Sequence, residues 1–414
     1  MSGVFPAGRP KPFSDGVKEE MSGMAYSGGS RRFAKWLRTT LWVGMAVLCA
    51  SAVGGAACAE GPEPAPGHGW PDLAALVRVG GPLSFCGEPV PLDNREVRER
   101  LEKELLLTIW DRPQVMLWLK RSTRYFPAIE QMLRDAGLPE DIKYVAIAES
   151  ALRAHAGSPK GAIGFWQFMP ATGRRMGLRI DSHLDERRNL RNSTDAAIRY
   201  LSALYAQFQS WTMAAAAYNM GEAGLQTEVL EQGTDDYYLL YLPLETQRFL
   251  FRILSAKMIF SDPLKYGFRL EEEDFYPPVA SDRVQVVCSQ AVPIRIVAQA
   301  AGATFKLIKD LNPELRGYYL QTGTHEIAVP EGAGEDFQRR FEEHLTTWNK
   351  GRAEQVYTVR SGDNLSIIAE RFNVPLKALL IWNRLDMNHP IQPGQRLVIY
   401  QPGRQNSSNA SEAE

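Results

Sequence analysis

The pattern of hydrophobic and polar positions divides the chain into a helical central block and a C-terminal part with short strands. From Asp93 onward, apolar residues follow a helical pattern through Val97, Leu101, Leu105, Leu106 and Ile109, and again through Val115, Leu117 and Leu119. The same spacing recurs in residues 194–208 and 245–260. Pro139 followed by Glu140 and Asp141 marks a helix start, because proline fits the first turn and acids complement its dipole. We therefore expect the central block to be mostly helix.

From Val284 the pattern changes to short β-branched runs on either side of helical segments. The order VQVV, IRIVAQAAG, FKLIKDLN, HEIAVP recurs later as VYTV, LSIIAERF, LKALLIWN, QRLVIY. An asparagine closes the second helix of each copy, at Asn312 and at Asn383. The repeat predicts two small βααβ modules of about 45 residues each. Between them, apolar residues at helical spacing predict a connecting helix: Phe337, Phe341, Leu345 and Trp348.

The N-terminal part has the pattern of a secretory signal. Residues 31–38 are basic, and an uncharged apolar run follows that tapers into small residues at Ala57-Cys58-Ala59. This order of regions predicts a cleaved signal peptide and export to the periplasm. Two alternatives stay open, an uncleaved membrane anchor and a lipid-modified Cys58, although Gly55 stands where lipoprotein signals usually carry leucine. Either alternative would associate the protein with the membrane.

These patterns give a predicted domain organisation. Proline and glycine enrichment after the signal predicts a linker, and the Ser/Asn/Glu-rich C-terminus predicts a disordered tail. The predicted parts are a signal peptide or anchor (1–59), a linker (60–92), a helical domain (93–270), a first module (282–331), a connecting helix (332–353), a second module (354–401) and the tail (402–414).

Composition and charge exclude several function classes. Hydrophobic residues make up 44% and charged residues 23% of the chain, which is ordinary for globular domains. The net charge of −1 gives no global basic excess that would favour nucleic acid. The six histidines show no paired spacing with Cys or carboxylates, so we expect no metal and no cofactor. Cys86 and Cys288 would remain after signal removal, either as a disulfide or as two unpaired thiols.

Glu149 is the first candidate for catalysis. It lies near the end of an apolar helical stretch, YVAIAESAL. Burial and a position near a helix C-terminus both disfavour the ionised carboxylate, so its pKa should rise, as a general acid requires. The alternative is an exposed helix edge, where Glu149 would be an ordinary solvated acid.

Two further segments are suited to binding a sugar. Residues 161–170, GAIGFWQFMP, combine glycines that allow close backbone approach with aromatic and amide side chains. Residues 214–224, AAAAYNMGEAG, form a small-residue helix that ends before Gly221, a predicted C-cap. Each segment also has a purely structural explanation, as a connector and as a core helix.

Together these residues resemble a known family. Glu149-Ser150, then Gly164-Phe165-Trp166-Gln167, then Ala217-Tyr218-Asn219-x-Gly221 resemble, in order and spacing, the three motifs of the lysozyme-like lytic transglycosylases. The segment LPLETQRFL, residues 242–250, is similar to the family's closing segment. The resemblance covers about residues 125–260 and implies a mainly α lysozyme-like catalytic domain of the α+β class.

The repeated module resembles LysM. The second copy carries Ser361-Gly362-Asp363, Asn383 and Pro393-Gly394-Gln395, whereas the first is degenerate, with Thr322-Gly323-Thr324 in place of Pro-Gly-Gln. This resemblance implies two small βααβ modules that hold the enzyme on N-acetylglucosamine-rich strands. For the first copy, a purely structural role remains open.

The transglycosylase resemblance implies a substrate and a mechanism. The partner would be the glycan strands of peptidoglycan, with Glu149 as single acid/base and a 1,6-anhydro sugar as product. Ser158 and Gln167 would hydrogen-bond the substrate, and Met169 would contact a sugar face. Tyr218 and Asn219 would orient the acid or the acetamido group of the substrate.

One residue departs from the family pattern. Phe249 stands where the closing segment usually carries a tyrosine whose hydroxyl points toward the catalytic acid. Either Tyr218 or another tyrosine supplies that contact, or the pKa of Glu149 lies higher than in relatives.

Two other functions are compatible with the same residues. A goose-type lysozyme would hydrolyse the same bond with a second acid, for which Asp181, Asp185 and Glu222 are the candidates, although each fits a solvated or capping role better. A wall-binding scaffold would carry an inert catalytic block and act through its LysM modules.

Overall fold

The computed structural model describes residues 73–353, 356–387 and 390–400, all within one unit, His68–Glu414. The predicted signal peptide (1–59) and the predicted tail (402–414) lie outside these residues. Among the helices in the described ranges, none is both long and apolar enough to cross a membrane.

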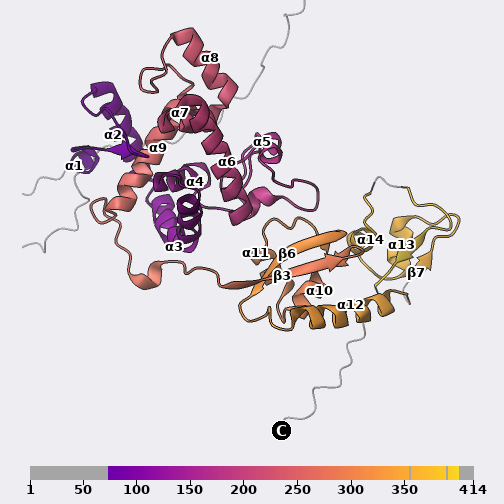
Figure 1. Cartoon of the computed structure of the whole chain (residues 1–414). Helices are drawn as coiled ribbons and strands as arrows, with labels where there is room; N and C mark the ends of the chain where they lie inside the picture. Colours follow the sequence, from indigo (N-terminus) through magenta and orange to yellow (C-terminus); the bar gives the residue numbers. More distant parts are fainter. Residues whose placement is uncertain (1–72, 354–355, 388–389, 401–414) are drawn as a thin grey trace, which may run out of the picture. The chain divides into compact units, whose positions relative to one another are not determined.

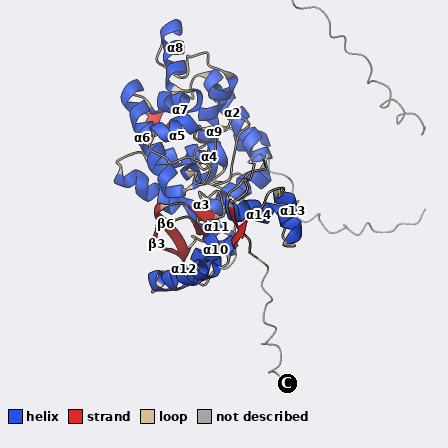
Figure 2. Ribbon diagram, turned by 90° about the vertical axis from the view of Figure 1, so that its right-hand side faces the viewer, coloured by secondary structure: helices blue, strands red, loops and turns tan. Residues whose placement is uncertain are grey.

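The central block is helical, as its pattern predicts (Figures 1 and 2). Three short 3₁₀ segments, Glu140–Ile142, Glu186–Arg188 and Glu272–Asp274, accompany the α-helices. The α-helices are α2 (Arg95–Trp110), α3 (Arg112–Asp135), α4 (Lys143–Ser150), α5 (Pro170–Arg175), α6 (Leu190–Phe208), α7 (Trp211–Met220), α8 (Glu222–Gln232) and α9 (Leu244–Ser261).

The predicted apolar face of α2 is nearly correct. Its N-terminus is capped by Asn94, whose side chain accepts a hydrogen bond from the Glu96 amide at 2.9 Å. Val97, Leu101, Leu105 and Ile109 are buried in the core, but Leu106 is 38% exposed. A helix buries only the stripe that faces its neighbours, and position 106 lies just outside that stripe.

Helix α7 lies in the middle of this domain and packs against α6, α8 and α9. Its residues Ala214–Ala217 are all buried, and their small side chains allow the neighbouring helices to approach closely. The helix ends at Gly221, whose φ of 92° lies in the region that favours glycine, so the predicted C-cap is confirmed. Helix α9 also packs against α4, which carries Glu149.

The predicted linker is wrong for residues 73–92. This segment forms α1 (Leu73–Val77) and an antiparallel hairpin of β1 (Ser84–Phe85) and β2 (Glu88–Pro89). Phe85 is 1% exposed and belongs to the core of the helical domain. The hairpin also reaches the start of α7, where the Glu88 carboxylate accepts from the Thr212 amide at 3.0 Å. Its proline and glycine residues mark turns of a packed segment rather than a free linker.

The first predicted module has strands at its edges and two helices between them. Its strands β3 (Ser281–Cys288) and β6 (Gly323–Pro330) pair antiparallel along their whole length. Between them lie β4 (Val292–Pro293), α10 (Ile294–Ala300), α11 (Phe305–Leu311) and β5 (Tyr319–Leu320), with β4 and β5 paired.

The predicted connecting helix is α12 (Phe337–Ala353), with Phe337 and Phe341 buried against the first module. The second module repeats the order in smaller form. Its elements are β7 (Val356–Thr358), α13 (Leu365–Arg371), α14 (Leu376–Asn383) and β8 (Arg396–Val398), with β7 and β8 antiparallel.

Asn312 and Asn383 make the same set of hydrogen bonds in the two copies. The amide group of Asn312 donates to the Ile308 and Ala328 carbonyls and accepts from the Ala328 amide, at 2.7–2.8 Å. Asn383 does the same with Leu379 and Val398. Each asparagine thus ties the second helix to the last strand, which gives the repeat seen in the sequence a structural basis.

The two cysteines within the described residues are both free. Cys86 lies in the N-terminal hairpin, and Cys288 is buried at the end of β3. Burial raises the pKa of the Cys288 thiol to about 11, so it is protonated and unreactive near neutral pH. Of the two alternatives left open by the sequence, the structure has the unpaired thiols.

Candidate active site

All six predicted site residues line one cleft of about 350 Å³. They come from three separate parts of the chain: the end of α4, the loop before α5 and the end of α7. The six are Glu149, Ser158, Gln167, Met169, Tyr218 and Asn219. Residues that the sequence pattern did not single out complete the lining, among them Lys160, Thr172 and Tyr200.

The end of α4 is held from several sides, which fixes Glu149. Just after it, Ala151 and Leu152 have φ values of 54° and 57°, a conformation that is strained for residues other than glycine. The Ser150 hydroxyl donates to the Phe165 carbonyl at 2.7 Å. Two arginines bind the terminal carbonyls, Arg121 that of Ala151 at 3.1 Å and Arg153 that of Ser150 at 3.0 Å. Basic side chains suit this end of a helix dipole.

The environment of Glu149 favours the protonated acid. Burial raises the pKa of Glu149 to about 8, against the opposing effect of the Arg252 charge and with a smaller contribution from Glu245. Among the described residues, none donates a hydrogen bond to its carboxyl group. The pKa of Glu149 is therefore raised, as the sequence predicts, and the main cause is the removal of the carboxyl group from solvent. A carboxyl group with this pKa still carries its proton at neutral pH.

Loop 161–168 forms one wall of the cleft and depends on a glycine. Gly164 has a φ of 89°, and a Cβ there would lie 1.7 Å from the Arg187 carbonyl oxygen. Next to it, Trp166 is fully buried and donates from Nε1 to the Thr194 hydroxyl at 3.0 Å. Gln167 follows with a φ of 48° and donates from Nε2 to the Gly164 carbonyl at 2.8 Å. The motif thus uses glycine for space and tryptophan as an anchor.

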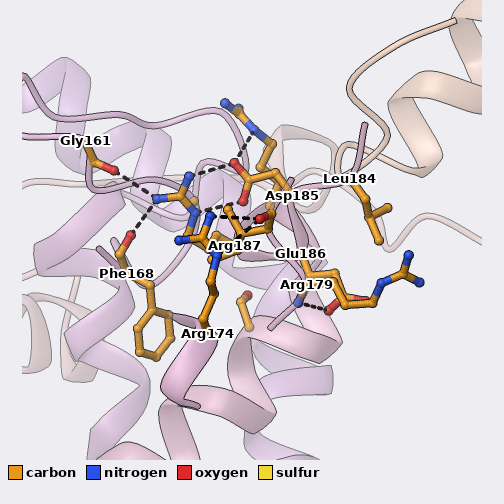
Figure 3. A network of polar contacts seen from close by, with 12 residues as sticks. Gly161, Phe168, Arg174, Arg179, Leu184, Asp185, Glu186 and Arg187 are labelled. Atoms are coloured by element: carbon orange, nitrogen blue, oxygen red, sulfur yellow. Dashed lines mark hydrogen bonds and ion pairs between the residues drawn. The ribbon is translucent and has the colours of Figure 1, made fainter. Parts of the chain in front are cut away.

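Arg187 holds both ends of this loop (Figure 3). Its Nη1 donates to the Gly161 carbonyl at 2.9 Å and to the Phe168 carbonyl at 3.0 Å. The buried charge is compensated by Asp185, which accepts from Nε at 2.8 Å and from Nη2 at 2.9 Å. Such a bidentate pair fixes the guanidinium plane and, with it, the loop.

Tyr218 and Asn219 connect the cleft to neighbouring segments. The Tyr218 hydroxyl donates to the Trp166 carbonyl at 2.7 Å, and the ring lies 5.3 Å from that of Tyr200. Asn219 accepts at Oδ1 from the Thr246 hydroxyl at 2.9 Å, so α9 orients its amide group. Its Nδ2 has no acceptor among the described residues and remains available to a ligand.

Only one of the three candidate second acids reaches the cleft. Asp181 accepts from the amides of His183 and Leu184 in a local turn, and Asp185 is the buried partner of Arg187. Glu222 lines the cleft and accepts from the Tyr200 hydroxyl at 2.7 Å. Hydrogen bonds from Arg175 and Tyr200 lower the pKa of Glu222 to about 2. It is therefore an ionised carboxylate in the first turn of α8, as a capping role predicts, and it is also engaged by Arg175 and Tyr200.

The residues missed by sequence reasoning left different signals. Tyr200 lies four positions before Leu204 on the buried face of α6, so its spacing indicated core packing alone. Lys160 lies two residues after Ser158 in a loop whose path the sequence does not specify. The described residues contain no group of three or more His, Cys, Asp or Glu side chains that could hold a metal ion.

Comparison with known proteins identifies the family. The transglycosylase SLT domain matches residues 126–240, and the LysM domain matches residues 357–399. Membrane-bound lytic murein transglycosylase D of Escherichia coli strain K12 is 30% identical over 348 residues, which cover 80% of this chain and 75% of that protein. This chain belongs to the lytic transglycosylase family. The protein of the same name from Escherichia coli O6:H1 matches equally.

A solved structure is similar over a smaller part of the transglycosylase. The 70 kDa soluble lytic transglycosylase of Escherichia coli is 17% identical, with a TM-score of 0.31, over 43% of this chain and 33% of that one. A likeness at that level adds nothing to the assignment. The expected transglycosylase domain and the second LysM module are confirmed, whereas the LysM match does not extend to the first module.

Proposed function

We propose that this transglycosylase cleaves the bond between N-acetylmuramic acid and N-acetylglucosamine in peptidoglycan, with Glu149 as its single acid/base. The observation that carries the proposal is the carboxyl group of Glu149, which lines the cleft and has its pKa raised to about 8. Near neutral pH it is protonated and can act as an acid. The family assignment supplies the type of reaction.

In the proposed first step, Glu149 donates its proton to the glycosidic oxygen as the bond from that oxygen to C1 of the muramic acid breaks. The carbonyl oxygen of the muramic acid's acetamido group then shares the positive charge at C1. In the second step, the C6 hydroxyl attacks C1 and gives its proton to the Glu149 carboxylate. A 1,6-anhydro sugar forms, no water is consumed, and Glu149 regains its proton. Most glycosidases use a second carboxylate as nucleophile or base at C1. In the proposed mechanism, the substrate's own acetamido group stabilises C1 instead.

The other cleft residues have roles in binding. The free Nδ2 donors of Asn219 suit a carbonyl oxygen such as that of the acetamido group. Met169 is 41% exposed in the cleft and suits contact with a sugar face. Ser158 and Gln167 provide further polar atoms for the substrate. Tyr218, whose hydroxyl is engaged by Trp166, acts as a support for the wall rather than as a donor to Glu149.

The test is digestion of purified cell wall followed by mass spectrometry of the products. The enzyme should release muropeptides that end in the anhydro sugar, and a Glu149→Gln variant should release none. Glu140→Gln, at an exposed glutamate of the adjoining 3₁₀ segment, is the matched control and should retain activity. Release of anhydro products by Glu149→Gln would refute the role of Glu149.

A hydrolase remains the second candidate because Glu222 is an ionised acid in the same cleft. A hydrolase would leave products heavier by one water, and Glu222→Gln would abolish them. The engagement of Glu222 by Arg175 and Tyr200 favours a structural role instead. An inert scaffold is tested by the same digestion, since its activity would equal that of Glu149→Gln.

The LysM module supports a role in retention on the wall. A module that binds the same polymer raises the local concentration of substrate without contributing to the chemistry. We further propose that the protein is exported to the periplasm, with membrane association through the N-terminus as one outcome. Fractionation of cells and N-terminal sequencing of the mature protein would decide between cleavage, lipidation of Cys58 and retention of an anchor.

A further inference from the structure

A second and larger cleft, of about 1010 Å³, lies next to the active site and shares no lining residue with it. We call it the arginine cleft. One wall belongs to the catalytic domain and carries Arg121, Arg124, Arg153, His155 and Arg191. The other wall belongs to the first module and carries Asp310, Glu326 and Glu331, together with one basic residue, Arg283.

The first module is attached to the catalytic domain by directional contacts beside this cleft. The Asp185 amide donates to the Glu314 carbonyl at 2.9 Å, and the Arg316 amide donates to the His183 carbonyl at 2.8 Å. Asn189, itself part of the cleft lining, donates from Nδ2 to the Glu314 carboxylate at 2.9 Å. The contacts of Glu314 with Asp185 and Asn189 join buried residues, whereas the Arg316–His183 contact lies at the surface, and together they hold the two walls.

The arginines of the first wall are not neutralised by the protein. Arg121, Arg124, Arg153 and Arg191 have no ion-pair partner within the described residues. Arg121 and Arg153 bind backbone carbonyls, Arg124 binds the Pro277 carbonyl, and Arg191 is exposed. The pKa of Arg121 is lowered mainly by burial and then by the charge of nearby Arg153, so these two guanidinium groups repel each other. An anion in this cleft would relieve that repulsion.

The second wall restricts the kind of anion. Its acids would repel a polyanion such as a phosphate polymer, but they suit a ligand that carries an amino group together with its carboxylates. Glu331 has no ion-pair partner in the described ranges and is the acid most open to a ligand. Glu326 lies 3.5 Å from Arg283 across the β3–β6 pair, and Asp310 pairs with Lys306. A short peptide with free carboxylates and a free amine matches both walls.

The position of the cleft relative to the active site also fits such a ligand. A single loop after α4 lines both, with His155 in the arginine cleft and Ser158 in the catalytic cleft. Three residues span at most about 11 Å, so the two clefts are near neighbours. An extended peptide of four residues reaches about 14 Å. A peptide attached to a glycan in the catalytic cleft is therefore long enough to enter the arginine cleft.

We propose that the arginine cleft binds the peptide stems carried by the glycan strand, through the stem carboxylates and the free amine. The proposal rests on the proposed function, since it assigns a second part of the same substrate. Stem binding here would make the enzyme prefer strands that still carry peptides and would set its position on the wall.

The test compares turnover of stem-bearing strands with that of strands stripped of their peptides by an amidase. The variants are Arg191→Glu and Arg124→Gln, which change the cleft without altering the arginines that hold α4. Arg269→Gln, at an exposed arginine outside the cleft, is the matched control. We expect the wild-type enzyme and the control to have a KM about tenfold lower for stem-bearing strands. The cleft variants should lose that preference while turnover of stripped strands is unchanged.

Equal turnover of both substrates by the wild-type enzyme would overturn the proposal, and so would a preference that survives in Arg191→Glu. Failure of the proposed function is recognised separately, because Glu149→Gln would then not differ from wild type on either substrate. A direct measurement uses calorimetry with a free tetrapeptide stem and the full-length Glu149→Gln protein. Loss of tetrapeptide binding when Arg191→Glu is combined with Glu149→Gln supports the proposal. Polyphosphate that binds as tightly as the tetrapeptide would contradict it.

Discussion

The hydroxyl of Tyr218 donates to the carbonyl oxygen of Trp166 at 2.7 Å. Burial and the charge of nearby Glu149 raise the pKa of Tyr218, so the hydroxyl keeps its proton. The tyrosine best placed to bind the catalytic acid is thus committed to the loop that forms the cleft wall. Phe249 is 2% exposed and has no hydroxyl to offer in its place. Of the alternatives raised by Phe249, a high pKa at Glu149 fits these contacts.

The first prediction concerns the pH dependence of activity. Because the pKa of Glu149 is raised to about 8, its acid form predominates below that pH and is lost as pH rises through it. The rate should therefore fall about tenfold per pH unit above pH 8. Initial rates of wall solubilisation between pH 6 and pH 10, at constant ionic strength, measure this. A profile that stays flat to pH 9.5 would exclude Glu149 as the acid in this range.

The second prediction restores the family's tyrosine. In Phe249→Tyr, a hydroxyl donor to the Glu149 carboxylate would favour the ionised form and lower its pKa. The alkaline limit of activity should move down by about one pH unit, the equivalent of one hydrogen bond. Phe251→Tyr, at another buried phenylalanine of α9 that packs on Tyr237 and Tyr238, is the control and should leave the limit in place. An unshifted limit in Phe249→Tyr would mean that position 249 does not contact the acid.

The third prediction tests the glycine of the cleft wall. Gly164→Ala would place a Cβ 1.7 Å from the Arg187 carbonyl oxygen at a positive φ, so the loop must move. We expect a loss of more than about 3 kcal/mol in the free energy of unfolding, together with loss of activity. At Gly157, which lies before this loop and forms a β-bridge with Ile163, the nearest atom to a Cβ is 3.8 Å away. Gly157→Ala should therefore be nearly neutral, and equal effects in denaturant melts would contradict the steric explanation.

The fourth prediction concerns Glu222 and stability. Its pKa is lowered to about 2 by hydrogen bonds from Arg175 and Tyr200, so its ionised form favours the folded state. That stabilisation is fully present above the ordinary glutamate pKa of 4.5 and is lost as pH falls toward 2. Glu222→Gln should therefore lower the melting temperature at pH 7 and have a diminishing effect as pH falls to 3. A difference that does not change with pH would show that the charge is not responsible.

The fifth prediction tests the shared asparagine of the modules. Asn312 is fully buried and makes three side-chain hydrogen bonds, one to the Ile308 carbonyl of α11 and two to Ala328 of β6. Asn312→Ala leaves two backbone carbonyls and one amide without this partner and should cost about 2–4 kcal/mol of unfolding free energy. Calorimetry should show a lower transition temperature. Asn192→Ala, at an exposed asparagine of α6, is the control and should have a small effect.

The sequence by itself determined the local structure and the identity of the chemistry. Helical spacing predicts α2 and α9, the repeat predicts two βααβ units, and Gly221 ends α7 as expected. These features follow from spacing and backbone preference, which act over a few residues and are therefore visible in the chain itself. The motif around Glu149 also indicated the acid and the direction of its pKa shift.

Tertiary structure alone decided which distant residues meet. Glu222 and Asp185 are both acids near charged neighbours, yet only Glu222 lines the cleft, whereas Asp185 is buried in an ion pair with Arg187. The hairpin within residues 73–92 has a linker's composition but packs into the core through Phe85. The arginine cleft exists only because residues far apart in sequence form its two walls. Burial and long-range contacts set these outcomes, and neither can be derived from local spacing.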